Sequence, residues 1–446
     1  MNKQIALNVA NTFIRHGIVL LGLLLAMSVS VASAAQTDVN TLYNSQQKSV
    51  TLDGPNWQHF AQLSDAGFLF VDENYQLLDA KNAQRFFVPA STTKLITALL
   101  SLQHWGEKHR FKTEFYLKQQ VDALPILIVK GYGDPFLVSE ELQILAKNLA
   151  VKLSKLGVTQ LAGIQLDASY YLPGLVMPGT GETDNPYDAI PASIAANFNS
   201  IYIHKNGKKL TSAEPQTPLT PAGLEIAKTI KGYTRSNNKR VNLGNDAQLN
   251  ERYFAELLGH FLHQNNITVG KQFSFAKVEQ DAGNPPKKIY THLNSKDLAE
   301  IIKPMMKYST NFIANQLALN IGAEMYGAPA TQQKVQKAYQ TLLSKQFHWQ
   351  KFHIEDGAGL SRNNQLALSQ LVDVLEAFTP WKNLLPQIET SVYAKSGTLI
   401  GVSTLAGYVQ KQQKFLPFAI MINQKVPFRF RNKLAKELAQ TAIKIR

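Results

Sequence analysis

The sequence of 446 residues predicts an α+β fold, in which a mainly antiparallel sheet is covered by helices. Strand-like runs occur near both ends: residues 66–79 contain two around a tight turn, and residues 393–423 contain three more. Between them a helix opens near Ser91, and we expect it to cover one face of the sheet. Its apolar face is formed by Leu95, Ile96, Leu99, Leu100 and Leu102.

The chain begins with the pattern of a secretory signal peptide. Lys3 and Arg15 precede an apolar run over residues 18–31, and the small residues Ala32-Ser33-Ala34 follow it. We predict cleavage after Ala34, so that residues 1–34 leave an exported chain. Because no later stretch is long and apolar enough to span a bilayer, the mature chain is predicted to have no transmembrane segment.

The middle of the chain combines strands and helices with a looser, proline-rich region. Strands over residues 112–118, 126–129 and 164–167, with a helix over residues 140–156, indicate a small α/β unit. Residues 172–250 predict short strands and loops, because prolines and glycines recur there. Further helices are predicted over residues 253–264, 297–321, 367–378 and 430–445.

Composition narrows the chemistry and the partners. The chain has no cysteine, which excludes thiol chemistry and cysteine metal sites. His260 and His263 lie one turn apart, but no third metal ligand is evident, so ordinary histidines are the better interpretation. The net charge of +14 favours anionic surroundings such as cell-wall polymers or membrane surfaces. No nucleic-acid motif is present, and an exported chain is not expected to bind nucleic acid.

Ser91 and Lys94 lie one helical turn apart on one face, with Cβ atoms about 5–6 Å from each other. A serine hydroxyl becomes a good nucleophile when a base takes its proton, and a neutral lysine can be that base. Neutrality near pH 7 costs a lysine about 4–5 kcal/mol, because its ordinary pKa is about 10.4. Burial or a second cation must supply that shift, so we expect another lysine to fold back onto this helix.

Three other Ser-x-x-Lys matches occur in different settings: a polar N-terminal segment, an Asn-rich basic turn and a strand-like run. Only Ser91 opens an apolar helix. Taken alone, this motif is better explained as a capping serine followed by a surface lysine. The other matches are Ser45 to Lys48, Ser236 to Lys239 and Ser274 to Lys277.

Lys395 is the candidate for the second cation, since Lys395-Ser396-Gly397 is the only Lys-Ser/Thr-Gly match in the chain. On a strand, Lys395 and Gly397 face one way and Ser396 the other. The glycine would let a ligand or another backbone approach closely, and an edge strand could pair with an extended peptide. Without the other motifs, an exposed strand lysine would be the simpler interpretation.

The third motif is Ser309-Thr310-Asn311, which stands beside a helix. Ser-x-Asn also occurs at residues 236–238 and 361–363, so the motif alone carries little weight. The order and setting of the three motifs give them more weight together. Ser-x-x-Lys at the start of a helix comes first, then Ser-x-Asn beside a helix, then Lys-Ser-Gly on a late strand.

The three motifs in this order resemble those of the penicillin-recognising serine enzymes, which include penicillin-binding proteins and serine β-lactamases. Finer matches resemble the D-alanyl-D-alanine carboxypeptidase and endopeptidase family that includes penicillin-binding protein 4. These are Pro89-Ala90-Ser91-Thr92-Thr93-Lys94-Leu95, Gly133-Asp134-Pro135, Asp356-Gly357-Ala358-Gly359-Leu360-Ser361 and Ala394-Lys395-Ser396-Gly397-Thr398-Leu399. Ser396 stands where threonine is usual, and Thr310 where an acidic residue is common.

The resemblance implies a penicillin-binding-protein or β-lactamase-like transpeptidase fold, an antiparallel sheet flanked by helices, with a large inserted region. The catalytic domain would consist of residues 35–110 and 290–446, and residues 111–290 would form the insertion. It also implies a periplasmic serine D-Ala-D-Ala carboxypeptidase, a DD-endopeptidase, or both, acting on peptidoglycan peptides. β-Lactams would be covalent inhibitors, and neither a metal nor an organic cofactor would be required.

Roles carry over from the family residue by residue. Ser91 would form the acyl-enzyme, Lys94 would accept its proton, and Ser309 would relay a proton to the leaving amine. Asn311 would hold the substrate amide and Lys94. Lys395 would attract the terminal carboxylate of the substrate, with the hydroxyls of Ser396 and Thr398 donating to it and Gly397 between them. The oxyanion would lie between the backbone N–H groups of Ser91 and Thr398.

Two alternatives remain open at this point. A class A β-lactamase uses a glutamate to position water, and Glu182 with Asn185 is the nearest candidate, although the leucine before the asparagine is missing. A non-catalytic wall-binding protein with the same fold is the other alternative, against which the complete set of motif residues argues.

Overall fold

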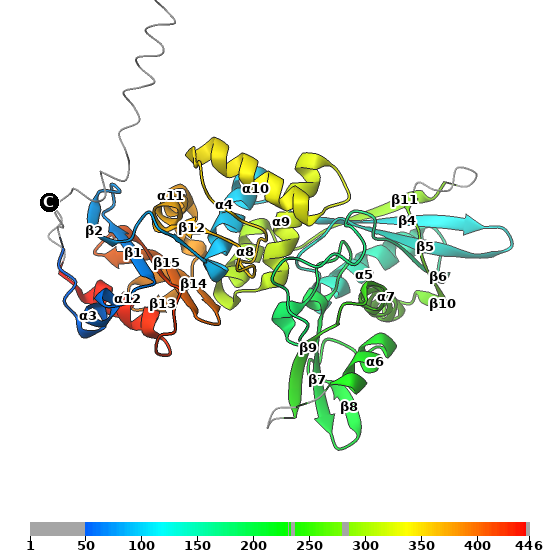
Figure 1. The fold of residues 1–446 in the computed structure, drawn as a ribbon. Coiled ribbons are helices and arrows are strands. Elements are labelled where there is room, and N and C mark those ends of the chain that lie inside the picture. The colour runs from blue at the N-terminus through cyan, green and yellow to red at the C-terminus, as the bar shows by residue number, and fades with distance from the viewer. Residues whose placement is uncertain (1–49, 231, 233–236, 279–284, 443–446) are drawn as a thin grey trace, which may run out of the picture. The chain divides into compact units, whose positions relative to one another are not determined.

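The computed structural model (Figure 1) describes residues 50–230, 232, 237–278 and 285–442. The predicted signal peptide and its cleavage site lie outside these residues. The described residues belong to one compact unit, residues 50–446.

A six-stranded antiparallel sheet unites the two ends of the chain, with strand order β13-β14-β15-β16-β1-β2. β1 pairs with β16, so that Phe68 lies opposite Ile420. The predicted central antiparallel sheet is therefore confirmed. Its strands are β1 (Ala66–Val71), β2 (Leu77–Lys81), β13 (Gln387–Glu389), β14 (Val392–Leu399), β15 (Val402–Lys411) and β16 (Lys414–Ile422).

Helices cover both faces of this sheet. α3 (Pro55–Ala61) and α12 (Phe430–Gln440) cover one face, where Trp57, Phe68 and Leu434 belong to one buried cluster. α11 (Leu368–Phe378) covers the other: a Cβ placed on Gly67 of β1 would lie 2.6 Å from a methyl group of Leu368. The apolar residues that alternate along the strands thus face two separate layers of helix.

The helix predicted after Ser91 is present as the short 3-10 turn η1 (Ala90–Thr92) followed by α4 (Thr93–Trp105). It contacts α8 (Leu298–Tyr308), α9 (Asn311–Tyr326) and α11. Every residue from Thr93 to Leu102 is buried, so the helix lies inside the protein. Its buried polar side chains form hydrogen bonds inside the protein: Thr97 donates to the carbonyl of Gly357 and accepts from Tyr339.

A mixed five-stranded sheet, in the order β10-β6-β5-β4-β11, is formed by residues from the middle of the chain. Its strands are β4 (Lys112–Gln120), β5 (Ala123–Gly131), β6 (Gln160–Asp167), β10 (Thr268–Phe275) and β11 (Lys287–Leu293). α5 (Ser139–Lys155) and α7 (Ala247–His263) pack against it through a second apolar cluster. The predicted small α/β unit corresponds to β4, β5, α5 and β6.

Residues 172–250 contain more regular structure than short strands and loops. They form the three-stranded sheet β8-β7-β9 and the helix α6. The first residue of α6 is a proline, and Thr220 caps the N-terminus of the helix. The proline that suggested a loop therefore begins a helix. The elements are β7 (Ser200–Asn206), β8 (Lys209–Ser212), α6 (Pro221–Thr229) and β9 (Asn238–Asn242), with the turns η2 (Pro186–Asp188) and η3 (Asn197–Asn199) before them.

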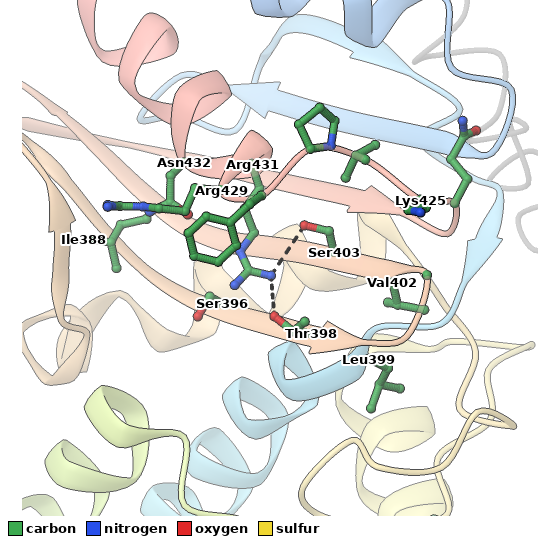
Figure 2. A pocket seen from close by; sticks show the side chains of 15 residues that line it. Ile388, Ser396, Thr398, Leu399, Val402, Ser403, Lys425, Arg429, Arg431 and Asn432 are labelled. Atoms are coloured by element: carbon green, nitrogen blue, oxygen red, sulfur yellow. Dashed lines mark hydrogen bonds between the residues drawn. The ribbon is translucent and has the colours of Figure 1, made fainter. Parts of the chain in front are cut away.

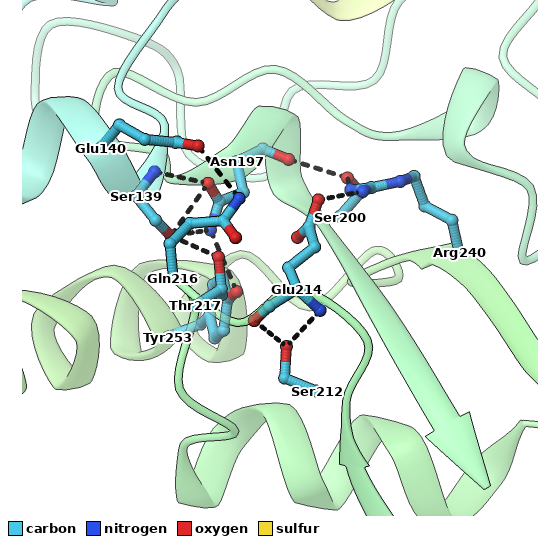
Figure 3. Close-up of polar contacts among 10 residues, drawn as sticks. All are labelled: Ser139, Glu140, Asn197, Ser200, Ser212, Glu214, Gln216, Thr217, Arg240 and Tyr253. Atoms are coloured by element: carbon cyan, nitrogen blue, oxygen red, sulfur yellow. Dashed lines mark hydrogen bonds and ion pairs between the residues drawn. The ribbon is translucent and has the colours of Figure 1, made fainter.

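Figure 3 shows a polar network that fixes these segments to the start of α5. The side chain of Asn197 accepts from the backbone N–H of Ser139 at 2.8 Å and donates to its hydroxyl at 2.9 Å. Thr217 donates to the same hydroxyl at 2.7 Å, and Arg240 pairs with Glu214. Because Ser139, Asn197 and Thr217 are buried, these bonds replace bonds to water and hold the loops in place.

The remaining elements differ from prediction mainly at their ends. Residues 297–321, which predicted one or two helices, belong to two helices, α8 and α9, separated at Ser309 and Thr310. α12 ends at Gln440 rather than at residue 445. Elements that were not predicted include α3, β11 and β13, and also α10 (Gln332–Phe347), the turn η5 (Thr379–Leu384), and the small pair β3 (Phe86–Phe87) and β12 (Leu366–Ala367).

Candidate active site

Segments far apart in the sequence meet around Ser91. η1 contacts β14 and β15, and α4 contacts α8 and α9. Lys94 donates to Ser91 Oγ at 2.9 Å and to Asn311 Oδ1 at 2.7 Å. Lys395 donates to Ser309 Oγ at 2.9 Å. The structure therefore brings together all five residues that the sequence proposed as catalytic.

Lys94 is fully buried, and its third hydrogen bond goes to the backbone carbonyl of Ala358 at 2.7 Å. Burial disfavours the ammonium form and lowers the pKa of Lys94 to about 7, although the nearby carboxylate of Asp356 acts in the opposite direction. Around pH 7, a large share of the molecules thus carries an uncharged amine next to the hydroxyl of Ser91. Such an amine can accept a proton from that hydroxyl.

Asp356 organises the turn that supplies the Ala358 carbonyl. Its buried carboxylate accepts hydrogen bonds from the backbone N–H groups of Ala358, Leu360 and Ser361. The side chain of Asn364 donates a further bond to it at 2.7 Å. The conformation of this turn, and with it the carbonyl that binds Lys94, therefore depends on one carboxylate.

We expect Asp356→Asn to shift the pH dependence of Ser91 acylation toward lower pH. Removal of the negative charge removes a favourable interaction with the ammonium form of Lys94, so the pKa of Lys94 falls below its wild-type value. Loss of an acceptor in the turn should also lower the unfolding free energy by about 1–3 kcal/mol. Acylation rates between pH 5 and 9 and a denaturant titration would measure both effects. A shift toward higher pH would contradict this role of Asp356.

The turn of η1 is held between two glycines. A Cβ on Gly397 of β14 would lie 2.7 Å from the backbone nitrogen of Ser91 and 3.0 Å from Ala90 Cβ. A Cβ on Gly359 would lie 1.9 Å from the carbonyl oxygen of Ala90. Ala90 itself has a backbone φ of 48°, which is uncommon for a residue other than glycine. The predicted close approach at Gly397 is thus present, and the partner is the backbone of Ser91.

Ser309 and Asn311 are positioned by the junction between two helices. Ser309 ends α8 in the left-handed conformation, with φ 57° and ψ 39°, and Asn311 is the first residue of α9. Asn311 accepts from Lys94 and donates through Nδ2 to the carbonyl of Tyr187 at 3.0 Å. The junction therefore turns both side chains of the Ser-x-Asn motif toward the two lysines.

β14 presents its motif residues on opposite faces, as predicted. Lys395 and Gly397 face η1, whereas Ala394 belongs to the cluster under α12, so Ser396 and Thr398 share that side of the strand. Lys395 is buried, and burial together with the charges of Lys94 and Arg431 holds its pKa well below the ordinary value.

The edge of β14 is open beside these residues. β13 pairs only with Val392 and Tyr393, while β15 occupies the other edge along the whole strand. An extended peptide could therefore add beside residues 395–399. Two cavities border motif residues. One, of about 590 Å³, borders Ser396 and Thr398 (Figure 2), and the other, of about 950 Å³, borders Ser309 and Asn311.

Arg431 is a residue of the site that sequence reasoning missed. It lies in α12, and its Nη1 donates to the carbonyl of Gly397, to Thr398 Oγ1 at 2.7 Å and to Ser403 Oγ at 3.5 Å (Figure 2). No local pattern singles out Arg431 among the basic residues near the C-terminus, so the sequence offered no signal for it.

The residues of the alternative interpretations lie elsewhere. Glu182 is exposed in the loop before η2, and no hydrogen bond joins it to Ser91 or Lys94 in the described part of the chain. His260 contacts the side chain of Gln264. Within the described ranges, no cluster of three or more His, Asp or Glu residues could hold a metal ion. No helix of the same ranges is long and apolar enough to cross a membrane.

Comparisons with known proteins concern the chain as a whole. The family model of the D-Ala-D-Ala carboxypeptidase 3 (S13) family matches residues 64–390. A D-alanyl-D-alanine carboxypeptidase of Actinomadura sp. (strain R39) is 24% identical over 80% of this chain and 77% of its own length. The D-alanyl-D-alanine carboxypeptidase DacB of Haemophilus influenzae is 24% identical over 79% of this chain and 84% of its own length.

A solved structure with a similar fold tests the predicted architecture. The crystal structure of penicillin-binding protein 4 (dacB) from Haemophilus influenzae superposes with a TM-score of 0.67 at 22% identity, covering 86% of this chain and 98% of that one. The predicted penicillin-binding-protein fold is thereby confirmed. The family model matches well over half of this chain, and the chain therefore belongs to the D-Ala-D-Ala carboxypeptidase 3 (S13) family.

Proposed function

We propose that this serine D-Ala-D-Ala carboxypeptidase uses Ser91 to attack the carbonyl carbon of the D-Ala-D-X bond in peptidoglycan stem peptides. The observation that carries the proposal is the buried amine of Lys94, 2.9 Å from Ser91 Oγ, with its pKa lowered to about 7. In the first step, the Ser91 oxygen forms a bond to the carbonyl carbon while its proton moves to Lys94 Nζ.

The negative charge that develops on the carbonyl oxygen needs fixed donors. The backbone N–H groups of Ser91 and Thr398 are the proposed pair, and the short approach of Gly397 to the Ser91 nitrogen supports it. Donors of this kind contribute about 10²–10³ in rate. η1 and β14 thus act together: one supplies the nucleophile, and both supply the oxyanion site.

Collapse of the intermediate breaks the C–N bond, and the leaving amine must gain a proton. Ser309 is the proposed relay, since its hydroxyl oxygen accepts from Lys395 and keeps its own hydrogen available for the amine. Asn311 holds Lys94 through its carbonyl oxygen and would offer its amide to the substrate backbone. Water then hydrolyses the ester on Ser91 and regenerates the hydroxyl.

The carboxylate of the residue that leaves would be recognised at β14. In its protonated form Lys395 would supply positive potential, and the hydroxyls of Ser396 and Thr398 would donate hydrogen bonds. The substrate would lie extended along the open edge of the strand. Residues 395–399 pair with β15 on the opposite edge, and no described strand pairs with them on this edge. The active form of the site would therefore bind a peptide whose D-residue carries a free carboxylate.

The proposal also covers the domain organisation, the location of the protein and its inhibition. The catalytic domain would consist of residues 35–110 and 290–446, and residues 111–290 would be the insertion, a division supported by the two separate large sheets. A cleaved signal peptide would export the chain to the periplasm. β-Lactams would acylate Ser91, which is supported by a solved complex of Haemophilus influenzae penicillin-binding protein 4 with a novel β-lactam.

Product analysis tests the substrate class. Purified muropeptides, monomeric pentapeptides and cross-linked dimers, would be incubated with the enzyme and analysed by mass spectrometry. We expect loss of one D-alanine from the monomers and conversion of dimers to monomers, both absent with Ser91→Ala. Unchanged muropeptides would contradict the proposal. Repeated turnover of a chromogenic cephalosporin, instead of one stoichiometric burst, would favour a β-lactamase.

A further inference from the structure

A cavity of about 340 Å³ lies at one end of the five-stranded sheet, and none of the proposed catalytic residues lines it. It borders the carboxyl ends of β6 and β10, which run parallel to each other beside α7 (Figure 1). Ligands of α/β sheets commonly bind at the carboxyl ends of parallel strands. The size of the cavity suits a small organic molecule.

The walls of this cavity are mainly apolar. Leu172 and Phe275 are large hydrophobic residues that remain 46% and 38% exposed, and several prolines and alanines complete the lining. Tyr171 is a buried part of the wall, and its hydroxyl donates to Asn320 Oδ1 at 2.7 Å, which fixes the position of its ring. The apolar part of a ligand would therefore meet a preorganised surface.

Glu251 is the unusual residue of the lining. It belongs to α7, and only 9% of its surface is exposed. Neither a hydrogen bond nor an ion pair joins its carboxylate to any described residue, and burial raises the pKa of Glu251 to about 7. A buried carboxylate without an internal partner costs stability, and groups of this kind are typical of functional sites.

The other charged residues of the lining do not share this property. Asp167 is buried, but its Oδ2 lies 3.7 Å from Lys130 Nζ and its Oδ1 accepts from the hydroxyl of Ser169 at 2.6 Å. Lys277 is exposed to solvent, which screens its charge. Glu251 is therefore the charged lining residue that still needs a donor, and a cationic donor forms the strongest hydrogen bond with a carboxylate.

We infer that this cavity binds a small molecule that carries an ammonium group on an apolar body. The ammonium group donates to the carboxylate of Glu251, and the apolar body lies against Leu172 and Phe275. The pairing of opposite charges offsets the cost of burying the carboxylate. The site shares no lining residue with the two cavities that border the motif residues, so the inference does not depend on the proposed function.

Two probes of nearly the same shape test the role of the charge. Phenethylamine carries an ammonium group, and 2-phenylethanol carries a neutral hydroxyl group in its place. At pH 8 we expect phenethylamine to bind with a dissociation constant on the order of 0.1–1 mM, and 2-phenylethanol to bind about tenfold more weakly or worse. Titrations followed by NMR of the probe would measure both constants. Equal affinities, or no binding of phenethylamine up to about 10 mM, would overturn the inference.

Glu251→Gln removes the charge and keeps the shape of the side chain. The affinity for phenethylamine should fall about tenfold or more, with penicillin labelling of Ser91 to verify that the variant is folded. Because the unpaired carboxylate costs stability when it is ionised, this variant should unfold at a higher temperature than the wild type at pH 8.

Glu107→Gln is the matched control, because it removes an exposed carboxylate outside the cavity lining. It should leave the affinity for phenethylamine at the wild-type value. Wild-type affinity in Glu251→Gln would show that phenethylamine binds elsewhere. A lower unfolding temperature of Glu251→Gln would mean that the carboxylate has a structural partner. Either result would overturn the inference.

Discussion

Ser91→Ala is expected to abolish covalent labelling by a fluorescent penicillin and to lower D-alanine release by a factor on the order of 10⁴–10⁶. The change removes the atom that forms the acyl-enzyme. It removes one hydrogen bond from Lys94, which keeps two others, to Asn311 and to the Ala358 carbonyl. The fold should therefore survive. Gel fluorescence and a D-alanine assay would measure the loss, with thermal unfolding to verify that the variant is folded.

Ser274→Ala is the matched control. Ser274 also precedes a lysine by three residues, but it lies exposed on β10. We expect this variant to label and to release D-alanine at the wild-type rate. Equal labelling of wild type and Ser91→Ala would place the acylated residue elsewhere and would remove the basis of the mechanism.

Lys94→Met has the second-largest expected effect, a decrease of about 10²–10⁴ in the rate of Ser91 acylation. Methionine fills a similar volume but accepts no proton, so the hydroxyl of Ser91 has no base next to it. The partners of Lys94 lose a donor, which costs stability, while the cost of burying an amine disappears. Stopped-flow acylation by a chromogenic β-lactam would give the rate.

Lys277→Met serves as the comparison for this variant, because Lys277 follows Ser274 by three residues outside the site. Its acylation rate should equal that of the wild type. If Lys94→Met acylated within about threefold of the wild type, another group would have to be the base, and the contribution expected of a general base would be missing.

The part of the site that the sequence could predict is the part carried by short motifs. Ser91 and Lys94 are linked by helical spacing, and Lys395 was expected because a neutral Lys94 needs burial or a second cation. The structure places Lys395 at Ser309, in the same cluster of residues. Burial lowers the pKa of Lys94, so burial and not the charge of Lys395 meets the chemical requirement, whereas the rare motif was sufficient to place Lys395 in the site.

Contacts that depend on tertiary structure were beyond sequence reasoning. Arg431 reaches Thr398 only because α12 crosses the sheet next to β14. Asp356 was part of a matched segment, but its hold on the turn that binds Lys94 depends on three backbone N–H groups. Neither contact follows from residue type or periodicity, because both require the packing of elements with no local signal for each other.

The fold, like the site, has elements that the sequence predicted and elements that it did not. Strands β14, β15 and β16 were predicted as strand-like runs, and the structure shows them as neighbouring strands of the six-stranded sheet. α6 and α10 were missed. Pro221 looked like a loop residue although proline is favoured at the first position of a helix, and α10 is a largely polar helix with only four buried residues. Patterns with weak amphipathicity give little signal to sequence analysis.

The pH dependence of Ser91 acylation tests the central claim most directly. Lys94 must be neutral to accept the proton, so the second-order rate constant for a β-lactam should rise with pH and level off above the pKa of Lys94, about 7. A rise that continues without a plateau up to pH 10 would mean that Lys94 keeps an ordinary pKa and is not the base for Ser91.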